Sequence, residues 1–244
     1  MNCSFSRLQT LVMATFFGEV VTGSYRYIDP DHPDYNDTRA APQAWSLADK
    51  IPQEESLLIV TEGDIAGSYV RLLHDCQPVA RIEADTGGKV EVVRGERFTQ
   101  VLCSGQETGN LGPVVMSLAS DTCTVLLLGS RHVSQLKSEE DTCGVHCLVT
   151  KKWEGVTPCP TLPSPNIVSG LLASLLTEGQ MTGKRVMAII TFTDVMTVDS
   201  LSLEPFKVIH KLDAVTKADL KQPSNIGAEL SKLKLFHCPA NLYM

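Results

Sequence analysis

The chain has 244 residues, 43% of them hydrophobic and 20% charged, a composition typical of a folded globular protein with a substantial core. Its net charge of −7 and pI near 5.4 argue against nucleic acid or an anionic membrane as a main partner, because both favour clustered Lys and Arg. No apolar run reaches the roughly 18 residues of a membrane-spanning helix, and the first dozen residues make a poor secretory signal. We therefore expect a cytoplasmic protein without membrane insertion.

The beginning of the chain divides into three stretches of different composition. Residues 1–12 precede a second methionine, and we expect them to be an extension outside the folded core. Residues 13–21 are an apolar element that opens the folded domain, which we predict to span 13–244. Residues 22–56 contain seven acidic residues, three basic residues and four prolines, with few apolar side chains to offset the entropy cost of ordering the chain. They are predicted to form a flexible, largely disordered acidic insertion.

The folded body begins at a short apolar run, Leu57–Val60, which is typical of a strand covered on both faces. Gly63 turns the chain, and Asp64 is expected to cap the helix that follows. Further short apolar runs, bounded by turn residues, follow as far as residue 149. They predict strands at Val79–Ile82, Thr99–Cys103, Val114–Leu118, Thr124–Leu128 and His146–Val149, with a turn at Gly87-Gly88.

The last third of the chain has clearer periodicity. A proline-rich loop precedes a predicted helix from Asn166 to Gln180, whose apolar residues recur at helical spacing. Val186–Phe192 is the strongest predicted strand, and helices are expected at Glu204–Lys211 and Asn225–Leu235. Strands that alternate with helices predict an α/β fold, a three-layer sandwich with a mainly parallel or mixed central sheet flanked by helices.

Several short motifs resemble catalytic or cofactor-binding signatures, but each departs from the pattern that its chemistry needs. The turn Gly63–Gly67 lacks the glycine spacing of a dinucleotide site. Gly183-Lys184-Arg185 is followed by a strand and has no Ser or Thr after the lysine, and Asp85-Thr86-Gly87 occurs once rather than as a pair. The histidines near strand ends, His132 and His146, are expected to be structural. We therefore predict no catalytic residue and no cofactor.

Cysteines near the middle of the chain raise the question of a metal site. Cys143, His146, Cys147 and Cys159 lie within seventeen positions, but a structural zinc site usually needs two closely spaced ligand pairs, and only one is present. Eight cysteines spread through a chain of cytoplasmic character are better interpreted as reduced thiols, several of them buried. No metal site is predicted.

The chain end, Leu242-Tyr243-Met244, combines an apolar residue, a tyrosine and a terminal carboxylate. Residues 239–241 before it include a proline and should not continue the preceding helix. Such a tail can fill a pocket on another protein, with the phenol and the carboxylate bound at the rim. The alternative is a frayed terminus without a role. We predict an exposed binding tail at 239–244, with Leu242, Tyr243 and Met244 as partner-binding residues.

Several separate segments of the chain share their sequence with one known family, in the same order along the chain. These segments are Met13–Val21 at the opening, Ser130-Arg131-His132-Val133 in the middle, Pro165–Val168, Thr193–Met196 and Glu204–Lys207 further on, and Asn241–Met244 at the end. Together they resemble the proteasome assembly chaperone 1 family, and the resemblance covers nearly the whole length but is strongest in these segments.

This resemblance implies a non-catalytic chaperone of core (20S) proteasome assembly. The implied partners are proteasome assembly chaperone 2, as a heterodimer, and the proteasome α subunits, whose ring the pair caps, helps to form and keeps from dimerising. The tail would belong to the hydrophobic-tyrosine-any class, with Leu242 in the apolar part of a pocket, Tyr243 packed in its groove and the Met244 carboxylate paired with a lysine. The implied location is the cytoplasm, with association with the endoplasmic reticulum as a second site.

A second hypothesis is a small-molecule enzyme on a phosphorylase-like or nucleotide-binding α/β fold. Its pocket would lie at the turn Gly63–Gly67, at the end of a strand and the beginning of a helix. It requires titratable side chains that converge at strand ends, and the sequence does not assemble such a set. A deep polar pocket at this turn, or a nucleotide that raises the melting temperature, would favour it.

Overall fold

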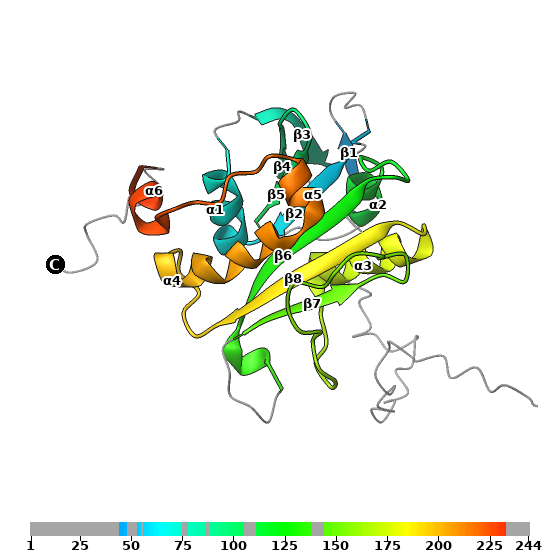
Figure 1. The fold of residues 1–244 in the computed structure, drawn as a ribbon. Coiled ribbons are helices and arrows are strands. Elements are labelled where there is room, and N and C mark those ends of the chain that lie inside the picture. Colours follow the sequence, from blue (N-terminus) through cyan, green and yellow to red (C-terminus); the bar gives the residue numbers. More distant parts are fainter. Residues whose placement is uncertain are drawn as a thin grey trace, which may run out of the picture. The chain divides into compact units, whose positions relative to one another are not determined.

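The computed structural model describes residues 44–47, 53–54, 56–74, 78–85, 88–104, 111–137 and 144–232 (Figure 1). Within them, no helix is long and apolar enough to cross a lipid bilayer.

One mixed sheet of eight strands organises the described residues (Figure 1). Its strands are β1 Trp45–Leu47, β2 Leu57–Glu62, β3 Pro78–Ala84, β4 Lys89–Arg94, β5 Thr99–Cys103, β6 Thr124–His132, β7 Val145–Val149 and β8 Arg185–Thr193. They lie in the order β1-β3-β4-β5-β2-β6-β8-β7. The four strands β5, β2, β6 and β8 are parallel to their neighbours within this group, and the outer strands pair antiparallel.

The central strands are apolar throughout because both faces of the sheet are covered. Every residue of β2 is buried, and its side chains alternate between two separate cores. Leu58 and Val60 belong to the core on one face, and Leu57 and Ile59 belong to the core on the other. The predicted strand at Leu57–Val60 is thus confirmed, and so is its position between two layers.

Two groups of helices make the outer layers. Helices α2 (Leu111–Met116) and α3 (Gly170–Met181) cover one face and pack against each other. The other face carries five helical segments, which are α1 Asp64–Leu72, α4 Ser200–Leu203, the 3-10 helix η2 Glu204–Lys211, α5 Asp213–Lys217 and α6 Ile226–Lys232. A short 3-10 helix, η1 Val133–Gln135, follows β6. The predicted three-layer α/β fold is confirmed.

The predictions for residues 114–118 and for the start of α3 were wrong. Residues 114–118, predicted as a strand, lie in α2 and the turn after it, because a short apolar run is compatible with either structure and Pro113 suits a first helical turn. Helix α3 begins at Gly170 rather than at Asn166. The Asn166 side chain instead bonds the backbone of Lys137 in both directions, which holds two loops together.

A few residues of the stretch 22–56, which was predicted to be a largely disordered acidic insertion, are described by the structure and take part in the fold. Strand β1 pairs with β3, and Trp45 is buried in the core. Glu54 is also buried and accepts a hydrogen bond from Thr99 Oγ1 at 3.1 Å. The rest of 22–56, together with 1–12 and 13–21, lies outside the described residues.

The first turn of α1 also differs from the prediction. Its N-cap is Gly63, with φ 89°, and no side chain caps the helix. Asp64 is the first helical residue rather than the cap. Glycine adopts this positive φ without strain, which explains why the chain turns here.

We predict that Gly179→Ala lowers the free energy of unfolding, although alanine favours helices. A Cβ at Gly179 in α3 would lie 2.3 Å from Val186 Cγ2 in β8, inside a packed core. Overpacking of this kind costs about 1–3 kcal/mol, more than the roughly 1 kcal/mol that alanine contributes in a helix. Urea denaturation measures the difference.

The matched control is Gly227→Ala in α6. A Cβ there would meet nothing closer than Asn225 Oδ1 at 3.6 Å, an ordinary contact, so this variant should be as stable as the parent or slightly more stable. Equal stability of the two variants would contradict the packing argument.

Candidate functional site

The parallel strands end at a common edge of the sheet, where polar residues gather. Strand β2 ends at Glu62, β6 at Arg131 and His132, and β8 at Thr193. Open α/β sheets bind ligands at the carboxyl ends of their strands, so this edge is the first place to look for a functional site.

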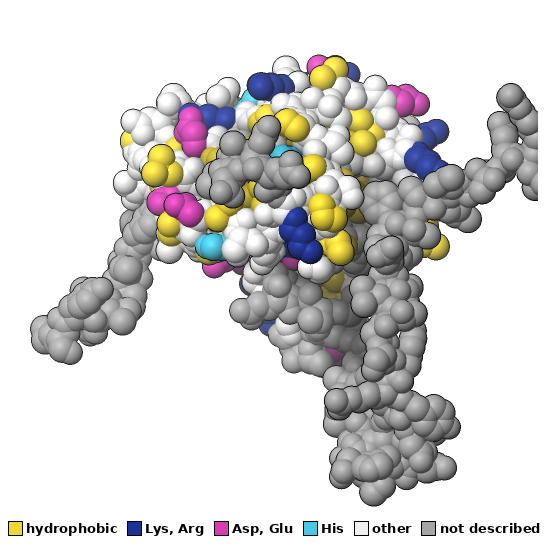
Figure 2. Space-filling view, turned by 90° about the horizontal axis from the view of Figure 1, so that it is seen from below, with side chains coloured by type: hydrophobic (Ala, Val, Ile, Leu, Met, Phe, Trp, Pro, Cys, Tyr) yellow, Lys and Arg dark blue, Asp and Glu magenta, His cyan; other side chains and the backbone are white. Residues whose placement is uncertain are grey.

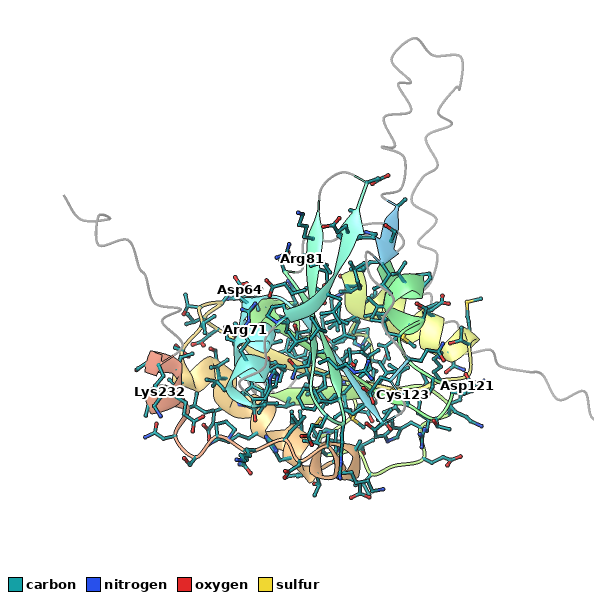
Figure 3. All side chains as sticks on the ribbon, turned by 90° about the horizontal axis from the view of Figure 1, so that it is seen from above. Asp64, Arg71, Arg81, Asp121, Cys123 and Lys232 are labelled. Carbon is teal, nitrogen blue, oxygen red and sulfur yellow. The ribbon has the colours of Figure 1, made fainter. Side chains whose placement is uncertain are left out.

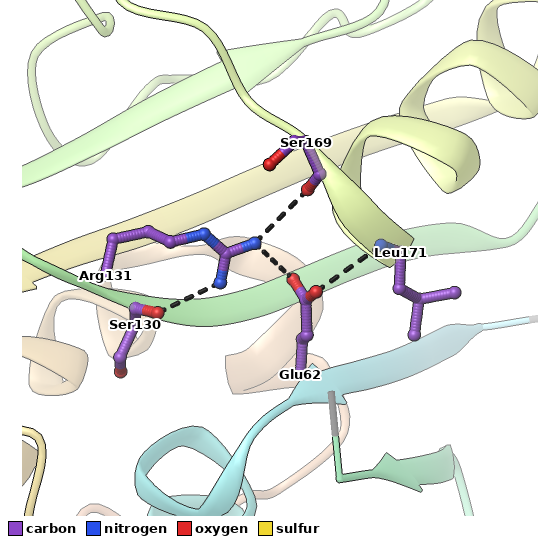
Figure 4. A network of polar contacts seen from close by, with 5 residues as sticks. All are labelled: Glu62, Ser130, Arg131, Ser169 and Leu171. Carbon is purple, nitrogen blue, oxygen red and sulfur yellow. Dashed lines mark hydrogen bonds and ion pairs between the residues drawn. The ribbon is translucent and has the colours of Figure 1, made fainter. Parts of the chain in front are cut away.

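An ion pair between β2 and β6 occupies the centre of this edge (Figure 4). Arg131 Nη2 donates to Glu62 Oε2 at 2.6 Å and to the Ser169 carbonyl at 3.2 Å, while its Nη1 donates to the Ser130 carbonyl at 3.0 Å. Glu62 Oε1 accepts from the Leu171 backbone N–H at 3.4 Å. The side chains are only 8% (Glu62) and 19% (Arg131) exposed, so the contact joins two strands to the beginning of α3.

Two glycines near this ion pair have no space for a side chain. A Cβ at Gly170, which has φ 74°, would lie 2.8 Å from Glu62 Oε1. A Cβ at Gly129 in β6 would lie 2.5 Å from Leu172 Cδ1. The backbone therefore approaches the carboxylate closely, and both carboxylate oxygens of Glu62 and both terminal nitrogens of Arg131 are engaged by protein groups. This arrangement suits a structural clamp better than proton transfer.

His132 joins the ends of β6 and β8. Its Nδ1 accepts a hydrogen bond from the Ser134 backbone N–H at 3.2 Å, so the His132 side chain caps η1. The same nitrogen lies 2.8 Å from Ser134 Oγ. Because Nδ1 accepts, Nε2 carries the proton and donates to the Asp194 carbonyl at 3.0 Å. This agrees with the sequence interpretation of His132 as structural.

His146 on β7 packs its ring against that of Phe192, with the ring centroids 5.8 Å apart. Its Nδ1 is buried and has no hydrogen-bond partner among the described residues. No carboxylate orients this imidazole in the described part of the chain, so the arrangement lacks the second group of an acid–base pair.

A buried Tyr–His pair lies on the face that carries α1. His210 Nε2 in η2 is 3.1 Å from the hydroxyl of Tyr69 in α1, and Tyr69 is fully buried. Burial, and then the nearby charge of Glu204, raise the pKa of the Tyr69 phenol far above its ordinary value. Burial also lowers the pKa of His210. Both groups are thus neutral at neutral pH, and their hydrogen bond fastens η2 to α1. The sequence analysis did not single out either residue.

Two of the clustered cysteines, Cys147 and Cys159, lie in contact in the structure. The Cys147 thiol donates to the Cys159 carbonyl at 3.2 Å, and hydrogen bonding from the neighbouring Cys159 thiol lowers the pKa of Cys147. Cys143 lies outside the described residues, and His146 precedes Cys147 on β7. Over the described ranges, no three His, Cys, Asp or Glu side chains are grouped as metal ligands.

An apolar groove lies between the end of β8, the beginning of β7 and α4. Its volume is about 440 Å³, and its lining includes Phe192, Val195 and Leu201. The apolar side chains of Val195, Met196 and Leu201 are 46%, 50% and 80% exposed. Exposed apolar groups beside a groove are typical of a protein-binding surface. We call this surface the β8–α4 groove.

The loop that borders the β8–α4 groove is held in place by its own hydrogen bonds. Thr193 Oγ1 donates to the Val195 carbonyl at 3.1 Å, and Asp199 caps α4 by accepting the Ser202 N–H at 2.7 Å. The exposed apolar side chains are therefore presented by an ordered backbone. On the face shown in Figure 2, the hydrophobic side chains of the described residues lie in small groups among charged and other side chains.

The tail residues predicted to bind a partner, Leu242, Tyr243 and Met244, lie outside the described residues. Their role therefore stays a prediction. The structure does bring together two motifs that are 62 positions apart in the sequence, since His132 bonds the backbone of Asp194.

We predict that Arg131→Gln destabilises the fold strongly. It leaves the Glu62 carboxylate buried without its cation, and loss of one partner of a buried pair costs about 3 kcal/mol or more. The double variant Glu62→Gln/Arg131→Gln should recover part of the loss, because no buried charge is then left unpaired. Chemical denaturation of both variants gives the coupling energy.

The exposed pair Arg71–Glu91 is the control. Its atoms are 3.4 Å apart and its side chains 42% and 45% exposed, so Arg71→Gln should cost less than about 1 kcal/mol. A loss for Arg131→Gln no larger than this would show that the Glu62–Arg131 pair is not a clamp.

Comparison with known proteins identifies the family. A family model named PAC1 and described as proteasome assembly chaperone 4 matches residues 106–244, more than half of the chain. Proteasome assembly chaperone 1 of Xenopus laevis is 29% identical over 134 residues, which are 52% of this chain and 46% of that protein. The Mus musculus protein of the same name is 33% identical over 88 residues, 34% of this chain and 30% of that one. The matches take in less than half of the length of either relative.

Solved structures share the fold at low sequence identity. Pyrococcus furiosus PbaA, described as an archaeal homologue of proteasome-assembly chaperone, has a TM-score of 0.54 and 10% identity over 78% of this chain and 92% of that one. Pyrococcus furiosus PbaB, described as an archaeal proteasome activator, has a TM-score of 0.50 and 12% identity over 80% and 94%. The match to the family model covers β6 with Arg131, the beginning of α3, and β8 with the residues that line the β8–α4 groove, whereas Glu62 on β2 lies outside the matched residues. On this basis the chain belongs to the proteasome assembly chaperone 1 family.

Proposed function

We propose that this chain is a non-catalytic chaperone of core proteasome assembly that acts as one subunit of a heterodimer with proteasome assembly chaperone 2. The heterodimer would bind the ring of α subunits, promote its formation and prevent two rings from associating with each other. The observation that carries the proposal is the family match over residues 106–244, which includes both the β8–α4 groove and the chain end.

The chemistry at the sheet edge supports a role in binding rather than in catalysis. Glu62 and Arg131 bond each other and backbone groups, and His132 bonds backbone on both ring nitrogens. A general acid or base must instead face a substrate with a free proton position. These side chains shape the edge so that its loops can contact another protein.

The β8–α4 groove is our candidate for the contact with proteasome assembly chaperone 2. Val195, Met196 and Leu201 expose apolar surface beside it, and burial of such surface drives association at roughly 25 cal/mol per Å². The loop is held by hydrogen bonds before any partner binds, so little conformational entropy remains to be lost on association.

The tail would anchor the heterodimer to the ring. Leu242 would enter the apolar part of a pocket between α subunits, the Tyr243 ring would pack in the groove with its hydroxyl hydrogen-bonded, and the Met244 carboxylate would pair with a lysine. This mode of binding depends on one rigid aromatic group and one charge, and the Met244 side chain would contribute little to the affinity. The place of action that accompanies this role is the cytoplasm, with the endoplasmic reticulum as an additional site of association.

We predict that Tyr243→Ala weakens binding to α-subunit rings by tens-fold. A tyrosine at the centre of a desolvated pocket contributes about 2 kcal/mol or more, which corresponds to a factor of about 30 in Kd. Surface plasmon resonance with immobilised rings measures the change. Deletion of Leu242–Met244 should have a larger effect than Tyr243→Ala.

Met244→Ala is the control for the tail, since it keeps the terminal carboxylate and should bind as the parent does. Native mass spectrometry should show that the tail variants still form the heterodimer. Ring binding by the truncated protein at the parent's affinity would exclude the anchor.

We predict that Leu201→Glu weakens heterodimer formation more than tenfold and leaves the fold intact. Leu201 is 80% exposed, so a charge there costs the free protein little, but it would be buried at the proposed interface. Val156→Glu is a matched control, because Val156 is 81% exposed and lies away from the groove lining. If both variants bind proteasome assembly chaperone 2 equally well, the β8–α4 groove is not the contact.

A further inference from the structure

A second cavity, of about 370 Å³, lies at the carboxyl ends of β2 and β5. It is bounded by the first turns of α1 and by β3 and β4, and its lining includes Thr61, Gly63 and Gly67. It therefore lies on the face of the sheet opposite to the Glu62–Arg131 clamp, because Thr61 and Glu62 are consecutive and point to opposite faces. It is at the turn where a nucleotide-binding enzyme of this fold would place its ligand.

A buried hydroxyl in the lining of this cavity lacks a partner. Thr61 is fully buried, and its Oγ1 makes no hydrogen bond with any described residue. It faces α1, since a Cβ at Gly67 would lie 3.7 Å from it. Buried hydroxyl groups are nearly always hydrogen-bonded, to protein or to ordered water, so the Thr61 hydroxyl is available to a water or to a bound group.

The beginning of α1 offers backbone donors at the same place. The helix has nine residues, and no side chain caps it. The Gly63 N–H donates to the Cys103 carbonyl at 3.0 Å, which joins the ends of β2 and β5 beneath the cavity. The next three N–H groups have no acceptor within the helix, and the helix dipole places partial positive charge there. A helix N-terminus of this kind binds anions.

Three cationic side chains line the cavity from different elements: Arg71 on α1, Arg81 on β3 and Lys89 on β4. Figure 3 shows Arg71 and Asp64 on α1 beside Arg81. Two carboxylates, Asp64 and Glu91, also line it, so the lining carries one net positive charge. Glu91 pairs with Arg71, while Arg81 makes no ion pair with another described residue and is free to meet an anion.

We propose that this cavity binds a phosphate group, either free inorganic phosphate or the phosphate of a small monoester. Its oxygens accept from the first N–H groups of α1 and from the Thr61 hydroxyl, and Arg81 pairs with its charge. The cavity is large enough for phosphate with a small sugar attached. This site is separate from the proposed chaperone contacts, and phosphate binding does not depend on them.

The test is thermal unfolding of the full chain with inorganic phosphate or ribose 5-phosphate, at constant ionic strength maintained with chloride. A ligand that binds only the folded state raises Tm along a saturating curve. A saturating rise with phosphate alone identifies free phosphate as sufficient, and a rise with ribose 5-phosphate alone identifies a monoester site. A rise that grows without saturation, or no rise with either compound, overturns the proposal.

Three variants distinguish phosphate binding in the cavity from a general effect of salt on stability. Thr61→Val removes the hydroxyl and keeps the shape, so the free protein should melt at the same temperature or higher, yet bind at least about tenfold more weakly. Gly67→Ala favours the helix and narrows the cavity. The free Gly67→Ala variant should likewise melt at the parent's temperature or higher, and it should bind phosphate at least about tenfold more weakly. Arg81→Gln should weaken binding without a change in the melting temperature of the free protein.

Lys152→Gln is the control, because Lys152 is exposed and outside the cavity, and it should keep the parent's saturating curve. Equal phosphate responses in the parent, Thr61→Val and Arg81→Gln would show that the ion acts on the protein surface at large. That result would leave the chaperone assignment untouched, since heterodimer and ring binding are measured separately.

Discussion

The contact on which the carboxyl edge of the sheet depends is the ion pair between Glu62 and Arg131. It is nearly out of water, and the cost of removing two charges from solvent is offset only because backbone groups complete the hydrogen bonding. The pair joins β2, β6 and the beginning of α3 at one point. Small displacements of any of these elements would leave a buried charge without its partner, so the pair fixes their mutual position.

Under the proposed function, this constraint explains how a sheet edge that resembles an enzyme's can contact another protein. In a catalytic α/β protein, the polar side chains at strand ends face a ligand. Here Glu62, Arg131 and His132 face protein groups instead, and the loop after β8 receives one of their bonds through the Asp194 carbonyl. The loop that borders the β8–α4 groove is thus tied to the clamp by adjacent residues of β6. A preorganised apolar surface loses little entropy on binding.

The layers of this fold could be predicted from the sequence, but the contacts between them could not. Continuous apolar runs indicate β2, β6 and β8, because a strand that is buried on both faces has apolar side chains at nearly every position. By contrast, nothing near Glu62 in the sequence indicates that its partner is 69 positions away. Residues 114–118 were misassigned because a short apolar run fits a buried helix as well as a strand. Strand β1 was missed because its few apolar residues lie in an acidic stretch whose composition predicts disorder. Its pairing with β3 is a contact between distant residues that the sequence does not reveal.

Alternation along β2 assigns two adjacent residues to different tasks. Glu62 points to the layer of α2 and α3, where it is paired with Arg131, and Thr61 points to the layer of α1, where it is part of the cavity lining. Because a one-residue shift of β2 would exchange these two side chains, the register of β2 with β5 and β6 determines both sites at once. The clamp that holds β2 against β6 therefore also holds Thr61 beneath α1. The cavity and the ion pair thus share one strand, whereas the β8–α4 groove lies at β8, two strands away from β2 and beyond β6.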